Sequence, residues 1–132
     1  GVHLKDLKLG KNIKYNGKIY KAKDFTFVEN GKKISFVLDT STNKNIVPFV
    51  KDSDLLICES SFSKDLENKA REYGHLTSKQ AGKIAKKSKS KKLIITHISQ
   101  RFENDMNRIL KEVKGVFKNT DLVKDLDVVN VE

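Results

Sequence analysis

The sequence is short of the features that mark several classes of protein. Its single cysteine excludes an internal disulfide bond and suits a reducing cytoplasm. That residue, Cys58, follows an apolar run, which favours a small buried hydrophobe over a metal ligand or nucleophile. There is no tryptophan, and a hydrophobic content of 37% allows one modest core in 132 residues. No apolar run approaches the roughly 20 residues of a membrane-spanning helix, and no signal-peptide pattern is present, so we expect no membrane partner.

Charge of one sign is abundant instead. The chain has 27 Lys and Arg against 17 Asp and Glu, a net charge of +10. A surplus of this size is typical of proteins that bind polyanions such as nucleic acids, although genome bias or heat adaptation also produces lysine-rich chains. The run Lys86–Lys92 is accordingly either an ordinary solvated turn or a patch that contacts phosphate.

Apolar runs and turn signals predict a layered α/β domain after an N-terminal extension. Asn16-Gly17 predicts a β-hairpin over 11–21, because both turn positions need positive φ, so we expect 1–32 to be a β extension and 33–132 an αβ core. In this core we expect a mixed sheet with flanking helices. The expected strands are 33–38, 54–58, 93–96, 122–123 and 128–131, and the expected helices are 42–50, 63–73, 77–88 and 104–117.

Two helix starts carry capping signals. Ser63 can cap the helix that Gly74 ends. Thr77 and Gln80 match a capping box, in which the hydroxyl binds the backbone and the amide reaches back.

Four residues that can bind a metal ion or move a proton stand at the ends of these elements. Asp39, Glu59 and His97 each follow an apolar strand, and His75 precedes a helix. Because α/β proteins commonly place their chemistry where strands end and helices begin, we predict that the four form one site.

Each of these residues also has a structural interpretation. Asp39 could cap the next helix, and His97 could be a hydrogen-bonded core residue. Glu59 would need a partner in a buried strand, for which His75 is a reasonable candidate. Arg101 could bind phosphate through its planar fork or be a surface residue at the start of a helix.

Taken together, the motifs resemble those of the C-terminal half of tRNase Z, the zinc endoribonuclease of the metallo-β-lactamase fold. The resemblance covers nearly the whole chain. Its motifs follow in the order Asp39-Thr40, then Cys58-Glu59-Ser60, then Gly74-His75-Leu76-Thr77, and then the most specific stretch, Thr96-His97-Ile98-Ser99-Gln100-Arg101-Phe102.

The resemblance implies a function and a role for each residue. The complete protein would be a zinc-dependent endoribonuclease that cleaves precursor tRNA to generate the mature 3′ end, by attack of a metal-bound hydroxide on a phosphodiester. Asp39 would bridge two zinc ions, and His97 would ligate one of them. Glu59 and His75 would form the catalytic pair. Contacts to the RNA phosphate would come from Arg101, Ser99 and Thr77.

The family's main metal motif, H-x-H-x-D-H, is absent, and the one further histidine, His3, lies in no such motif. We therefore expect residues 1–132 to be the C-terminal half of a metallo-β-lactamase αββα sandwich, with Gly1 near the point where the first half would end. The chain alone should be inactive. An uncovered inner sheet face would leave an apolar patch, so we expect the missing N-terminal half as its partner and a homodimer or poor solubility without it. The alternative function is a non-catalytic subunit that binds nucleic acid or a partner.

Overall fold

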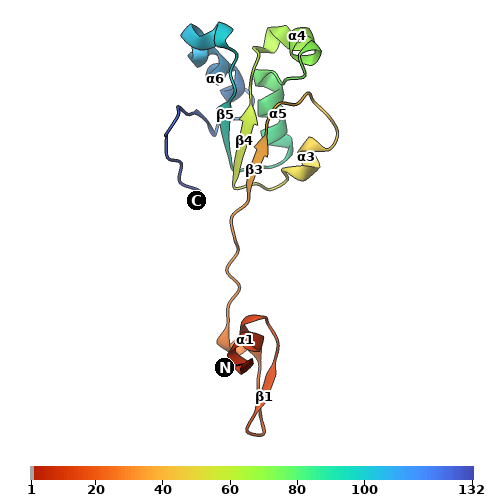
Figure 1. Cartoon of the computed structure of the whole chain (residues 1–132), viewed down its shortest axis with the longest axis vertical. Helices are drawn as coiled ribbons and strands as arrows, with labels where there is room; N and C mark the ends of the chain where they lie inside the picture. The colour runs from red at the N-terminus through yellow and green to blue at the C-terminus, as the bar shows by residue number, and fades with distance from the viewer. Residues whose placement is uncertain (1) are drawn as a thin grey trace. The chain divides into compact units, whose positions relative to one another are not determined.

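The computed structural model of the chain describes residues 2–132, with side chains from Leu4 onward. Gly1, where we placed the start of the half, and the side chain of His3 lie outside the described residues. The chain forms two compact units, of which one ends at Gly31 and the other runs from Lys32 to Glu132 (Figure 1).

The first unit contains the expected hairpin between short helices. Strands β1 (Ile13–Tyr15) and β2 (Lys18–Tyr20) pair antiparallel, and Asn16 and Gly17 between them have φ values of 46° and 76°. Both turn residues are thus left-handed, as a type I′ hairpin turn requires. The hairpin prediction is confirmed, but the extension also contains α1 (Val2–Lys8) and α2 (Ala22–Phe25).

The second unit is a four-stranded sheet whose strands alternate with helices. Its strands lie in the order β3 (Ile34–Val37), β4 (Leu55–Glu59), β5 (Lys92–Thr96) and β6 (Thr120–Leu122), and each neighbouring pair is parallel. The layered α/β prediction is confirmed. The sheet is parallel rather than mixed, because every connection contains a helix that returns the chain to the same edge. These connections contain α3 (Ile46–Phe49), then η1 (Lys64–Leu66), α4 (Glu67–Glu72) and α5 (Ser78–Lys87), and finally η2 (Gln100–Asp105) and α6 (Met106–Lys114).

The carboxyl-terminal residues after β6 form no strand, so the strand predicted at 128–131 is wrong. Instead, Val128 and Val129 line a hollow beside Ile94 of β5. The tail borders this hollow without joining the hydrogen-bond ladder of the sheet, and Val128 is 89% exposed. Within residues 2–132, no helix is both long and apolar enough to cross a membrane.

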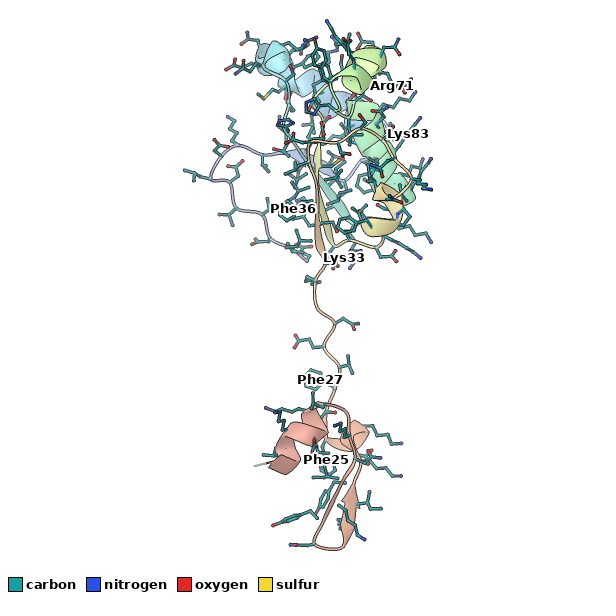
Figure 2. The ribbon with its side chains drawn as sticks, turned by 45° about the vertical axis from the view of Figure 1, so that its right-hand side comes forward. Phe25, Phe27, Lys33, Phe36, Arg71 and Lys83 are labelled. Atoms are coloured by element: carbon teal, nitrogen blue, oxygen red, sulfur yellow. The ribbon has the colours of Figure 1, made fainter. Side chains whose placement is uncertain are left out.

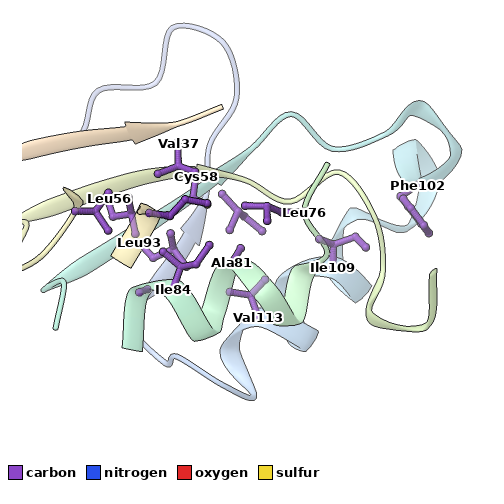
Figure 3. Packing of buried hydrophobic residues seen from close by; sticks show 14 residues of the cluster. Val37, Leu56, Cys58, Leu76, Ala81, Ile84, Leu93, Phe102, Ile109 and Val113 are labelled. Atoms are coloured by element: carbon purple, nitrogen blue, oxygen red, sulfur yellow. The ribbon is translucent and has the colours of Figure 1, made fainter. Parts of the chain in front are cut away.

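One face of the sheet carries the hydrophobic core. Strands that are neighbours in sequence are also neighbours in the sheet. Because crossover connections between parallel strands share one handedness, they place the connecting helices on the same face. Figure 3 shows α5 and α6 packed under that face. The buried cluster includes Val37, Leu56, Cys58, Leu76, Ala81, Ile84, Leu93, Ile95, Ile109 and Val113.

The opposite face is apolar but uncovered along β3. We call Ile34, Phe36 and Leu38 the open face, and they are 47%, 58% and 49% exposed. They alternate with the buried Ser35 and Val37, as the two-residue period of a strand requires. In Figure 2, Phe36 lies on the side of the sheet away from α5. Among the described strands of the sheet, exposed apolar surface on this face is therefore present along β3 alone, because Leu55 and Ile94 on the same face of the neighbouring strands are only 4% and 2% exposed.

The two predicted helix caps differ in outcome. At the start of α5, Thr77 Oγ1 accepts from the Gln80 backbone N–H at 3.3 Å, and Gln80 Oε1 accepts from the Thr77 N–H at 2.9 Å. The capping box is confirmed. Ser63 makes no capping bond, because its hydroxyl donates to Asp65 Oδ1 at 2.6 Å. The first turn there is 3₁₀, and the α-helix begins later.

Candidate active site

The four predicted residues meet at the carboxyl ends of the parallel strands. Asp39 follows β3, Glu59 ends β4, His97 follows β5, and His75 lies between α4 and α5. One potential ligand atom from each of Asp39, His75 and His97 lies within 4.8 Å of the other two. The two imidazole rings are 5.2 Å apart between centroids. The structure thus brings together side chains that are 58 residues apart in sequence, from Asp39 to His97.

Two members of this cluster have an unusual backbone. Asp39 and His97, each directly after its strand, have φ values of 49° and 54°. The left-handed region costs a residue other than glycine about 1–2 kcal/mol, although Asp and His adopt it more readily than most. Such strain persists where the surrounding structure holds it, and it concentrates at functional sites.

Glu59 connects the loops around the site. Its side chain is fully buried, and its two oxygens accept four hydrogen bonds. Oε1 accepts from the Thr40 N–H at 2.6 Å, and Oε2 accepts from His75 Nδ1 at 3.0 Å. Oε2 also accepts from the Leu76 N–H at 3.1 Å and from Ser61 Oγ at 2.7 Å. One carboxylate therefore fixes three loops, and the partner suggested for Glu59 is in place.

These hydrogen bonds select the nitrogen that each histidine can present. His75 Nδ1 is occupied by Glu59, so Nε2 remains for a metal ion or a substrate. His97 Nδ1 lies 3.1 Å from Ser61 Oγ, whose single proton goes to an oxygen acceptor. The same nitrogen lies 3.4 Å from Asp39 Oδ1, and when it carries the proton it can donate to either oxygen, which leaves Nε2 of His97 free.

Sequence reasoning missed Ser61 and Thr40. Ser61 is 3% exposed and touches both Glu59 and His97, and Thr40 donates its N–H to Glu59. The only sequence signal is proximity, because Thr40 directly follows Asp39 and Ser61 follows Glu59 by two residues.

Cys58 faces the core rather than the site. Its side chain is fully buried, and burial raises the pKa of its thiol well above the ordinary value, with the neighbouring Glu59 carboxylate raising it further. A thiol held neutral is a poor nucleophile and a poor metal ligand. The structure therefore supports the interpretation of Cys58 as a small hydrophobe.

The residues predicted to contact phosphate are divided. Arg101 is exposed and Ser99 is half-buried, and both line a cavity of about 550 Å³ next to the histidines. Thr77 is 1% exposed and its hydroxyl caps α5, so it is not available to RNA and the structure gives it a different role. The run Lys86–Lys92 ends at the first residue of β5, at the edge of the sheet opposite to the site.

The donor set suits a transition metal better than calcium or magnesium. Two imidazoles and one carboxylate are ligands that zinc prefers, whereas the harder ions take oxygen ligands almost alone. The hydrogen bond that His75 Nδ1–H donates to Glu59 is also of the kind that orients histidines at metal sites. With or without His75, the described residues supply fewer than the four ligands of a tetrahedral site, so the set fits part of a centre.

Fold and site together define a chain of the metallo-β-lactamase fold class. The solved structure of YhfI from Bacillus subtilis, a metallo-β-lactamase fold protein, superimposes with a TM-score of 0.62 and 31% identity, over 67% of this chain and 36% of that one. Human tRNase Z, short form, matches 86% of this chain and 37% of its own, with a TM-score of 0.60 and 27% identity.

Within this class the chain is a relative of ribonuclease Z. It is 38% identical to ribonuclease Z of Lactobacillus helveticus over 99% of its length, and 36% identical to that of Saccharolobus solfataricus over 98%. No protein-family model matches the chain. The chain spans 43% of the length of each of these two relatives.

Proposed function

We propose that this chain is part of a zinc-dependent endoribonuclease that cleaves precursor tRNA to generate its mature 3′ end. The observation that carries the proposal is the cluster of Asp39, His75 and His97, whose ligand atoms lie within 4.8 Å of one another. The buried Glu59 carboxylate contacts His75 of this cluster. The names of the curated relatives, ribonuclease Z, and the solved human tRNase Z support the substrate class.

Each residue has a distinct task in this proposal. Asp39 and His97 would hold zinc, which would act as a Lewis acid at the scissile phosphate. Glu59 holds His75 Nδ1–H, so that Nε2 faces the cluster and can give a proton to the leaving oxygen. The guanidinium of Arg101, in the adjoining cavity, holds an RNA phosphate together with the Ser99 hydroxyl.

The remaining zinc ligands come, in this proposal, from an N-terminal half that the 132 residues do not contain. That half would pack on the open face and complete the site from the other side. The complete protein would be cytoplasmic. Without its partner half, the chain should self-associate through the open face, and Phe36→Lys should weaken that association. Sedimentation tests this, and a monodisperse monomer of the unaltered chain would contradict it.

Metal binding is tested with two matched aspartates in the complete native protein. Asp39 and Asp52 are both exposed and both have positive φ, at 49° and 56°, so alanine disturbs the backbone equally at each. Asp39→Ala should remove bound zinc, measured by mass spectrometry, and lower cleavage of precursor tRNA by at least about 100-fold, the loss that changes to outer-shell partners alone can reach. Asp52→Ala should leave both unchanged. Equal effects of the two variants would refute the assignment.

The role of His75 is tested by separating metal content from rate. His75→Ala should slow cleavage by about 10²–10⁴-fold, the usual contribution of a general acid, while zinc content stays intact. Loss of zinc in this variant would reassign His75 as a ligand. RNA binding by an unaltered protein that cleaves no precursor tRNA would instead favour the non-catalytic alternative.

A further inference from the structure

Next to the two site histidines, a cavity of about 550 Å³ extends to an exposed aromatic ring. Its walls include His75, His97, Tyr73 and Arg101. Its volume lies in the range of pockets that hold small organic groups. Any group in this cavity therefore lies against the residues that face the scissile phosphate in the proposed function.

Tyr73 is held in place although it is exposed. The residue is 60% exposed, while Phe62 next to it is buried. The two rings are nearly parallel, at 17° and 6.2 Å between centroids. The Tyr73 N–H donates to the Lys69 carbonyl at 3.0 Å, and Gly74 (φ 76°) then turns the chain toward the site. A large aromatic ring kept exposed in one orientation is typical of a binding surface.

Arg101 reaches the same aromatic residue from another segment. Its guanidinium carbon lies 5.2 Å from the centre of the Phe62 ring. Figure 1 shows α4, which precedes Tyr73, at the end of the sheet to which the strands point, where η2 with Arg101 also begins. Phe62 thus supports two exposed groups, an aromatic face and a planar cation.

The chemistry of these groups matches an unpaired nucleotide. Single-stranded RNA is bound by stacking its bases on aromatic rings and on arginine planes. A phosphate alone would explain Arg101 but not Tyr73, and a purely apolar ligand would not need Ser99 and Gln100 in the lining. Packing of the core does not explain a tyrosine that is 60% exposed.

We propose that Tyr73, supported by Phe62, forms a stacking site for the unpaired base of the nucleotide next to the cleaved phosphate, while Arg101 in the same cavity keeps the phosphate that the proposed function gives it. The inference rests on the proposed function for RNA as the ligand, and it adds the position of a base. It separates two tasks within one cavity, because the histidines face the phosphate and Tyr73 faces the base.

The first test is a cycle between protein and RNA, measured as KM and kcat in the complete native protein. Tyr73→Ala should raise KM about tenfold, which corresponds to about 1.4 kcal/mol and lies within the range for one stacked base, with kcat unchanged. Tyr73→Phe should restore the wild-type KM. Phe49→Ala, which removes an aromatic ring that is 68% exposed on α3, should change nothing.

The substrate is changed in the same way. With the wild-type protein, an RNA that lacks the base beside the cleaved phosphate should have a KM about tenfold higher than the complete RNA. With Tyr73→Ala, the two RNAs should have the same KM, because the two changes remove one contact. If instead the two changes together raised KM by the product of their separate effects, the contacts would be independent and the proposal would be overturned. A wild-type protein that cleaves no RNA would instead refute the proposed function, and the second test would then decide this inference by itself.

That second test needs no cleavage. The 132-residue chain contains no tryptophan, so Tyr73→Trp places a single tryptophan at the site, and its emission can be excited apart from that of the remaining tyrosines. Its emission should be quenched by a short oligouridylate and not by an abasic oligomer of the same length and charge. Equal quenching by both oligomers, or quenching by neither, would overturn the stacking site.

Discussion

Glu59→Gln is the substitution that tests the structure of the site most directly. It keeps the shape of the side chain and replaces one acceptor oxygen with an NH₂ donor group. In the milder orientation the amide oxygen takes the position of Oε2, where three donors converge. The NH₂ group then faces the N–H of Thr40, which donates to Oε1 at 2.6 Å in the unaltered chain.

The expected loss follows from these four hydrogen bonds. Three of them change from charge-assisted to neutral, at about 1 kcal/mol each, and the fourth leaves a half-buried N–H without its acceptor, at about 1 kcal/mol more. The sum, about 4 kcal/mol, is a large share of the 5–15 kcal/mol by which a typical domain is stable. For a chain of this size it corresponds to a fall in Tm of more than about 10 °C.

Thermal unfolding followed by circular dichroism measures this loss, with the exposed Glu103→Gln as the control for the removed charge. A fall in Tm of less than about 3 °C for Glu59→Gln, relative to that control, would mean a contribution below about 1 kcal/mol. The buried carboxylate would then not connect the loops of the site, and the reasoning would be wrong.

Three further substitutions give separate tests of the packing and the charges. Ser61→Ala should destabilise the chain by about 1–2 kcal/mol in urea unfolding, because it removes a donor to a buried carboxylate. The control, Ser60→Ala, removes a buried hydroxyl that has no hydrogen-bond partner and should leave the stability unchanged. Gly82→Ala should cost about 1–3 kcal/mol, because its Cβ would lie 2.9 Å from the side chain of Val116 in the turn after α6. Gly115→Ala meets only ordinary contacts at 3.4 Å and should be neutral or stabilising. A hydrogen bond from a lysine ammonium and one from a backbone N–H lower the pKa of Asp54. The contribution of Asp54 to the stability of the fold is therefore complete above the ordinary carboxyl pKa of about 3.9, and it is lost as pH falls through the lowered value. Asp54→Asn should therefore flatten the acid limb of the stability curve below about pH 4, and identical limbs for both proteins would contradict this.

Features set by local chemistry could be predicted from the sequence. The Asn16-Gly17 turn and the Thr77–Gln80 capping box each depend on residues at most three positions apart, and both are present. The positions of Asp39, Glu59 and His97 followed from the apolar strands that precede them. A parallel sheet brings such strand ends to one edge, so the cluster could be predicted as a group.

Features that depend on distant segments could not be predicted. The Ser63 hydroxyl was expected on the backbone but donates to Asp65, and nothing in the local sequence distinguishes the two acceptors. The Ser61 hydroxyl meets His97 across 36 residues of chain, a contact that exists only once β4 and β5 are paired. The last predicted strand, 128–131, has the right composition, yet the residues lie beside the sheet without pairing.

The left-handed backbone at Asp39 and His97 limits which mutations evolution can sample there. A β-branched residue at either position would disturb the fold before its chemistry could be tried, whereas Asn, Asp and His enter that region several-fold more often than other side chains. The residues that this backbone tolerates thus overlap with those that coordinate metals, so a change that the fold tolerates at these positions more often yields another polar side chain than an inert one. Asn at position 39 would preserve the shape and lose only the charge. Single substitutions at the two strand ends could therefore change the chemistry of the proposed site while the sheet beneath them stays the same.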